Sequence, residues 1–137
     1  MILGFTGSRQ GLSDFQKTEI EKFISVNAHE ITEFHMGDCI GADEQASLIV
    51  SKYPSISIIS HPPTEEKSRA FYKAHKVLPP KKYLDRNRDI VDASDLILAA
   101  PNGEERQRSG TWSTIRYAKK KNIKIVICLP QEIIETF

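Results

Sequence analysis

Residues 1–9 are MILGFTGSR, an apolar run from Met1 to Phe5 that leads into the glycine-containing turn Thr6-Gly7-Ser8. Beyond the turn, apolar residues recur with the period of one helix face: Phe15, Ile20, Phe23 and Ile24. Ser13 precedes them and is a typical helix N-cap, because its hydroxyl can accept a hydrogen bond from an otherwise unpaired amide. The segment therefore predicts a buried strand, a turn and a helix, which is the repeating unit of an α/β fold.

The same unit recurs along the chain. Further strands are expected at residues 31–36, 56–59, 95–99 and 123–128, and further helices at residues 42–52, 85–93 and 110–121. The strands are nearly continuous apolar runs, which is typical of a parallel sheet covered on both faces. We therefore expect a Rossmann-like, doubly wound α/β domain with a mainly parallel sheet of about five strands and helices on both faces.

Two segments do not follow this pattern. Residues 64–83 are rich in Lys, Glu, Pro and Tyr and show weak periodicity. We expect them to form a long, partly helical excursion, and segments of this kind are often functional. The tail, residues 130–137, predicts no element.

Size and composition predict one folded domain over residues 1–137. The chain is 39% hydrophobic and 27% charged, which is ordinary globular usage, and it is too short for two cores. Its net charge of +1 makes nucleic acid an unexpected partner. It has no apolar run that suits a membrane span or a secretory leader, so no membrane contact is expected. Cys39 and Cys128 are too few for a disulfide framework and favour a reducing compartment, which predicts a cytoplasmic location.

Three predicted turns contain glycine and follow predicted strands: Thr6 to Arg9, Gly37 to Asp43, and Arg108 to Thr111. In a parallel sheet the carboxyl ends of the strands lie at one edge, and the following helices point their unpaired amides toward it. Glycine lets such amides approach a phosphate group closely. Each glycine alone could simply close a tight turn. Three such turns at one edge predict an anion-binding site.

Four stretches together resemble the SLOG superfamily, a Rossmann-like group that includes DNA-processing proteins and cytokinin-activating nucleotide phosphoribohydrolases. They are FTGSR (residues 5–9), HMGDCIGADEQA (35–46), YLDRNRDIVDASDLILAAP (83–101) and RSGTWSTIRYAKKK (108–121). The resemblance implies a homo-oligomer that binds a nucleotide or a nucleotide-derived small molecule. It implies ligand contacts from Gly7, Ser8, Arg9, Gly37, Asp38, Gly41, Asp43, Arg86, Asn87, Arg88, Ser109, Gly110 and Thr111.

Thr114 bears on whether such a ligand is cleaved. The phosphoribohydrolases carry a glutamate at the matching position, and an unactivated threonine hydroxyl is a poor substitute for a carboxylate at a sugar carbon. Asp38, Asp43, Glu104 or Glu105 could supply a carboxylate from another turn. We expect a protein that senses or sequesters a ligand, such as a cyclic or ADP-ribose-type signal in defence, and we assign no catalytic residue. The alternative is an N-glycosidase (phosphoribohydrolase) acting on nucleoside monophosphates, and a DNA-handling protein is a third possibility.

Other side chains are candidates for contacts with the charge or the base of the ligand. Arg86 and Arg88 stand two apart on a predicted helix and do not share a face, so we expect only one of them to be functional. Trp112, Tyr72 and Tyr83 are candidates for stacking on a base, although Trp112 could equally pack in the core.

Two histidines lie near the ends of predicted strands. His61 follows a strand and is a candidate ligand contact, and His35 lies within one. Neither has a second histidine or cysteine at a metal-ligand spacing, so we expect no metal site. No cofactor is expected either.

Overall fold

Six strands and four α-helices make up the part of the chain that the computed structural model describes, residues 1–131. The strands are β1 (Ile2–Gly7), β2 (Glu33–Met36), β3 (Ser57–Ser60), β4 (Lys76–Val77), β5 (Leu96–Ala100) and β6 (Lys124–Ile127). The α-helices are α1 (Asp14–Asn27), α2 (Ala42–Val50), α3 (Tyr83–Ala93) and α4 (Gly110–Lys120), and a short 3-10 helix, η1, spans Glu66–Ser68.

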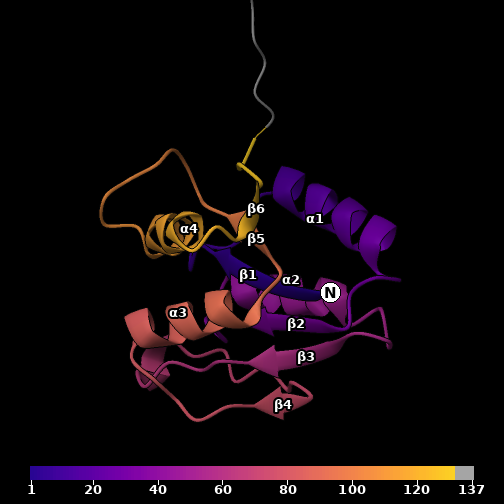
Figure 1. The fold of residues 1–137 in the computed structure, drawn as a ribbon, viewed down its shortest axis with the longest axis horizontal. Helices are drawn as coiled ribbons and strands as arrows, with labels where there is room; N and C mark the ends of the chain where they lie inside the picture. Colours follow the sequence, from indigo (N-terminus) through magenta and orange to yellow (C-terminus); the bar gives the residue numbers. More distant parts are fainter. Residues whose placement is uncertain (132–137) are drawn as a thin grey trace, which may run out of the picture.

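All six strands are parallel and lie in the order β4-β3-β2-β1-β5-β6 (Figure 1). The chain moves outward from β1 to β4 and then returns to the other side of β1 for β5 and β6. This confirms the doubly wound α/β fold, and it places the reversal of strand order between β1 and β5. Ligands of such folds bind beyond the carboxyl ends of the strands at this point.

The strand count is six rather than about five, because the excursion at residues 64–83 contains β4. This strand is a two-residue pairing of Lys76 and Val77 with the end of β3, and both side chains are exposed. A strand of two exposed residues has no apolar run in the sequence by which it could be predicted. The only helical turn in the excursion is η1, where a partly helical segment was expected.

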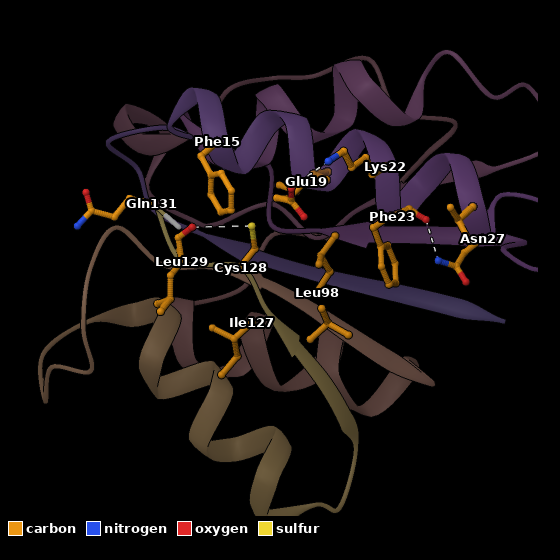
Figure 2. A pocket seen from close by; sticks show the side chains of 13 residues that line it. Phe15, Glu19, Lys22, Phe23, Asn27, Leu98, Ile127, Cys128, Leu129 and Gln131 are labelled. Carbon is orange, nitrogen blue, oxygen red and sulfur yellow. Dashed lines mark hydrogen bonds and ion pairs between the residues drawn. The ribbon is translucent and has the colours of Figure 1, made fainter. Parts of the chain in front are cut away.

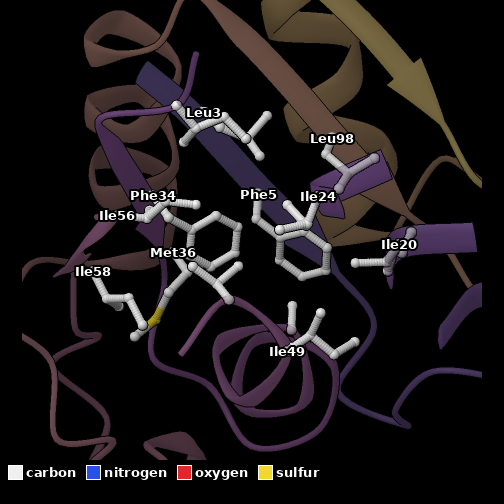
Figure 3. Close-up of a cluster of buried hydrophobic side chains, with 14 of the residues drawn as sticks. Leu3, Phe5, Ile20, Ile24, Phe34, Met36, Ile49, Ile56, Ile58 and Leu98 are labelled. Atoms are coloured by element: carbon white, nitrogen blue, oxygen red, sulfur yellow. The ribbon is translucent and has the colours of Figure 1, made fainter. Parts of the chain in front are cut away.

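Each face of the sheet has its own hydrophobic core. On one face α1 and α2 cover a large cluster that includes Phe5, Phe34 and Met36, all at most 1% exposed (Figure 3). On the other face α3 and α4 cover a smaller cluster around Ile97 and Ile115. Successive residues of a strand point to opposite faces, and a sheet buried on both faces therefore requires continuous apolar strands.

The first helix begins as predicted. Ser13 Oγ accepts a hydrogen bond from the Gln16 amide (3.1 Å), and Gln16 Oε1 accepts one from the Ser13 amide (3.0 Å). This reciprocal pair is a capping box, which satisfies two donors that a helix start leaves unpaired. Ser13 is thus confirmed as the N-cap.

The C-terminal tail and the expected lack of membrane contact remain to be compared with the structure. The unassigned tail extends to residue 137, and its last part, residues 132–137, lies outside the described residues. Among the described residues, none of the helices has the length and apolar character needed to cross a bilayer.

Candidate functional site

A polar pocket with a volume of about 510 Å³ lies at the reversal of strand order. Its walls come from the end of β1, the turn after β2, the first half of α3, the loop at residues 102–109 and the start of α4. A volume of this size suits a small-molecule ligand. Most of the predicted site residues line this pocket: Gly7, Ser8, Arg9, Gly37, Asp43, Arg86, Asn87, Ser109, Gly110 and Thr111.

The first two turns are bound to each other at Gly41. Its φ of 93° is in the region that favours glycine, and a Cβ here would collide with the main-chain carbonyl of Arg9. The neighbouring Ala42 amide donates a hydrogen bond to the Ser8 carbonyl (3.0 Å). Gly41 does not line the pocket itself, and its visible role is to let the second turn approach the first.

Arg86 fastens the carboxyl ends of β2 and β3. The residue is 5% exposed, and its Nη1 donates hydrogen bonds to the Gly37 and His61 carbonyls, the latter at 3.3 Å. Its Nη2 lies 3.5 Å from Cys39 Sγ. A Cβ at Gly37 would overlap the guanidinium, so a larger residue there would displace Arg86 from this position. Burial raises the pKa of the Cys39 thiol, which argues against a nucleophilic role for it.

Three other arginines surround the pocket: Arg9, Arg106 and Arg108. They are exposed, and none of them forms an ion pair with a carboxylate among residues 1–131. Arg9 lies over the ring of Tyr83, with its Cζ 4.5 Å from the ring centroid, and Arg106 Nη2 donates to Asn102 Oδ1 at 3.0 Å. Guanidinium groups without carboxylate partners around one concave site attract an anion.

The start of α4 contributes a second anion-binding feature. Ser109 caps the helix, and its Oγ accepts a hydrogen bond from the Trp112 amide (3.3 Å). The amides of Gly110 and Thr111 are in the first turn and have no intrahelical acceptor. A Cβ at Gly110 would meet no other atom within 4 Å. The helix start is therefore open toward the pocket, and its positive dipole end favours a negative group there.

Asp43 is a carboxylate that lines this basic pocket. It is 6% exposed, and its Oδ2 accepts a hydrogen bond from the Cys39 amide (3.1 Å). Burial raises the pKa of the Asp43 carboxyl from 3.8 to about 6, although the Arg86 guanidinium acts in the opposite direction. Asp43 can therefore change its protonation state close to neutral pH.

Besides Gly41, two predicted site residues lie outside the pocket, Asp38 and Arg88. Asp38 is buried and accepts hydrogen bonds from Arg69 Nε (2.9 Å) and from the Tyr72 amide (2.9 Å). It thereby fixes the loop after η1 to the turn after β2. Arg88 instead lies over the ring of Tyr117, 5.3 Å from its centroid, in the groove between α3 and α4. Of Arg86 and Arg88, the one that lines the pocket is thus Arg86.

The structure also shows where Thr114 and the candidate catalytic carboxylates lie. Thr114 is 3% exposed, and its Oγ1 donates a hydrogen bond to the Gly110 carbonyl (3.0 Å), so the hydroxyl is used within the helix. Glu105 pairs with Arg116 (3.0 Å). Neither Glu104 nor Glu105 lines the pocket, and Asp43 is the carboxylate that does, within residues 1–131.

Of the three aromatic candidates for stacking on a base, one lines the pocket and two do not. Tyr83 lines the pocket, whereas Trp112 is 8% exposed and donates its Nε1 hydrogen to the Gly103 carbonyl (3.3 Å). Tyr72 packs against the core under α2. Sequence reasoning missed Asn102 and Arg106 as lining residues. Their position in the polar loop after the strand at 95–99, at the same sheet edge as the other turns, is the signal that could have found them.

The two histidines contact each other, which their sequence spacing does not reveal. His35 Nδ1 and His61 Nε2 lie 2.7 Å apart, and His35 Nε2 lies 2.8 Å from Glu33 Oε1. Burial lowers the pKa of His61 to about 4, and the neighbouring His35 acts in the same direction. Within the described part of the chain, no group of three metal-ligating side chains comes together. Neither histidine lines the pocket.

A second hollow, of about 570 Å³, lies between α1 and β6 (Figure 2). Its lining is mainly apolar, with Phe15, Phe23 and Leu129 among its residues. Its two nearest charges, Glu19 and Lys22, already pair with each other at 3.4 Å. It offers no helix start and no free guanidinium, so the polar pocket at the strand ends is the candidate site.

Comparisons with known proteins support the fold. No family model and no curated protein matches the chain. Among solved structures, the molybdenum cofactor binding protein from Rippkaea orientalis is 19% identical with a TM-score of 0.75, covering 95% of this chain and 77% of that one. DNA processing protein A from Helicobacter pylori, known for single-stranded DNA binding, is 18% identical with a TM-score of 0.66, covering 99% and 68%.

The molybdenum cofactor (Moco) carrier protein from Chlamydomonas reinhardtii is also similar, at 18% identity and a TM-score of 0.62 over 92% of this chain and 74% of that one. These neighbours share the Rossmann-like α/β fold of this chain. Likeness at these identities shows the fold alone. Membership of the superfamily, the homo-oligomer and the role in defence stay predictions.

Proposed function

We propose that this protein senses or sequesters a phosphorylated, nucleotide-derived ligand in the polar pocket at the strand ends. The observation that carries the proposal is the group of arginines, Arg9, Arg106 and Arg108, that surround the pocket without carboxylate partners among residues 1–131. Such charges stay near one another most readily when an anion lies between them. The open start of α4 supplies unpaired amides to the same space.

The proposal includes a cytoplasmic protein of the SLOG type. Cys39 and Cys128 are both free thiols, which suits a reducing compartment. Two of the structural neighbours are named for the molybdenum cofactor and one for single-stranded DNA, and both therefore belong in a ligand screen.

Asp43 favours a second candidate function, cleavage of an N-glycosidic bond in a nucleoside monophosphate. It is a buried carboxylate in the pocket whose pKa of about 6 suits a general acid. Thr114 argues against this activity, because the matching glutamate is absent and the hydroxyl is hydrogen-bonded within α4. We therefore place binding first.

The test is a ligand screen by thermal shift, with AMP, cyclic AMP, ADP-ribose, molybdenum cofactor and single-stranded DNA, and with chromatography of each sample to detect a released base. We expect a shift with at least one phosphorylated nucleotide and no released base. The variant Arg108→Ala should lose the shift. Arg88→Ala is the matched control, because that arginine lies outside the pocket, and it should keep the shift. A shift that survives Arg108→Ala and Arg9→Ala alike would contradict the proposed site.

A further inference from the structure

Asp43 is unusual because an acidic side chain lies inside an otherwise basic pocket. Its Oδ2 accepts the Cys39 amide and thereby stabilises the turn after β2. The Gly37 amide also donates a hydrogen bond to this carboxylate. A carboxylate has about four lone-pair sites, and Asp43 lines the pocket, so acceptor sites remain beyond these two amides. Holding the turn therefore uses part of the acceptor capacity of the carboxylate and leaves the rest available to the pocket.

The Asp43 carboxylate limits which chemical groups of a ligand can lie next to it. A phosphate group next to a carboxylate would be repelled, and this repulsion is strong in a partly buried site. The neighbouring guanidinium does not neutralise Asp43 through a direct contact, because Arg86 directs its Nη atoms to Gly37, His61 and Cys39. The chemical group that completes this end of the pocket must instead donate a hydrogen bond.

We propose that Asp43 is a specificity-determining residue that accepts a hydrogen bond from an O–H or N–H group of the ligand, while the phosphate of the same ligand occupies the start of α4 and the free arginines. This inference rests on the proposed function and adds the chemistry of the end of the ligand that lies next to Asp43. The ligand is then an anion at one end and a hydrogen-bond donor at the other. Inorganic phosphate alone satisfies only the first requirement.

Two parts of a nucleotide can supply the donor. The ribose carries a vicinal diol, which a carboxylate binds well, and the base carries N–H groups. The two sources are separated by three probes that share a 5′-phosphate: AMP, 2′,3′-dideoxy-AMP, which lacks the diol, and ribose 5-phosphate, which lacks the base.

The experiment is isothermal titration of these probes into the wild-type protein and into Asp43→Asn at pH 7.5. The asparagine is isosteric, and its carbonyl oxygen can still accept the Cys39 amide, so the turn is retained. If the ribose is the donor, the wild type should bind AMP at least about 10-fold more tightly than dideoxy-AMP, since hydrogen bonds to charged groups are stronger than those between neutral groups. If the base is the donor, ribose 5-phosphate should be the weak probe. In either case Asp43→Asn should lose the preference.

A second measurement needs no variant. The ratio of the two dissociation constants, dideoxy-AMP over AMP, is measured in the wild type from pH 7.5 to pH 5. The phosphate is common to both probes, so its own titration cancels in the ratio. The ratio should fall on acidification as Asp43 loses its charge, and for a base donor the ratio of ribose 5-phosphate to AMP should fall in the same way.

The outcomes distinguish the inference from the function beneath it. A preference among the probes that is unchanged in Asp43→Asn and independent of pH would overturn the inference and leave anion binding intact. If the wild type binds none of the three probes, the inference fails, and the ligand screen decides separately whether the proposed function holds. A circular dichroism melt of Asp43→Asn establishes that the variant is folded.

Discussion

Thr114 Oγ1 donates a hydrogen bond to the main-chain carbonyl of Gly110, one turn earlier in α4, at 3.0 Å. The hydroxyl is thus committed to the helix whose start faces the pocket, and it lies on the buried side of that helix. We predict that Thr114→Val keeps the thermal shift with nucleotide and loses about 1 kcal/mol of stability through the missing hydrogen bond. Denaturant unfolding and the ligand screen measure the two effects. Release of a free base by the wild type, abolished in Thr114→Val, would show instead that the hydroxyl takes part in catalysis.

Asp38 is predicted to be a structural residue. Its carboxylate is fully buried and holds Arg69 and the Tyr72 amide, while its own φ of 53° is in the left-handed region. Removal of a buried acceptor leaves these donors unpaired, and we expect Asp38→Ala to cost about 2–4 kcal/mol in the free energy of unfolding.

Asp38→Asn is the matched control, because asparagine tolerates the left-handed conformation and keeps one acceptor oxygen. It should cost clearly less than the alanine variant. Equal stability of Asp38→Ala and the wild type in urea unfolding would refute the structural role.

Asp43 and His61 are predicted to give opposite pH dependences of stability. The folded-state pKa of His61 is lowered from 6.5 to about 4, so the unfolded state takes up the proton first and stability is lost as the pH falls from 6.5 toward 4. The folded-state pKa of Asp43 is raised from 3.8 to about 6, so the folded state takes up the proton first and stability is gained as the pH falls from 6 toward 3.8. Between pH 7 and pH 5 each contribution is about 1–2 kcal/mol.

Variants separate these two contributions. Urea unfolding at pH 7 and pH 5 should show that Asp43→Asn loses more stability on acidification than the wild type, and that His61→Gln loses less. The comparison uses the change between the two pH values, because either substitution also alters stability at neutral pH. Identical changes in the wild type and both variants would mean that neither side chain has a shifted pKa.

Much of the fold was predictable because the buried strands are apolar on both faces, which requires no knowledge of long-range contacts. The strand β4 was missed since Lys76 and Val77 are exposed and pair through main-chain groups alone. The contact of His35 with His61 was missed for a different reason. It depends on the register in which β2 pairs with β3, where His35 is opposite Ile59, and no local pattern carries that register.

The candidate site was predictable to the extent that it follows from strand ends. Gly7, Gly37 and Gly110 lie at the turns where a doubly wound sheet brings its loops together. Tertiary contacts decide whether the side chain of a charged residue near such a turn enters the pocket, and the sequence does not show these contacts. Asp38 and Asp43 stand five residues apart, yet Asp38 is bonded to a distant loop and Asp43 lines the pocket.

The central claim is that an anion lies against the start of α4, and Gly110 tests it most directly. Space around its Cα is open, so Gly110→Ala should fold and bind as the wild type does. Gly110→Asp should also fold, because a carboxylate at a helix N-terminus is stabilising, but its charge would take the place of the ligand phosphate. In isothermal titration with AMP, the account predicts wild-type affinity for Gly110→Ala and at least about a 10-fold loss for Gly110→Asp. Equal affinities for the two variants would contradict it.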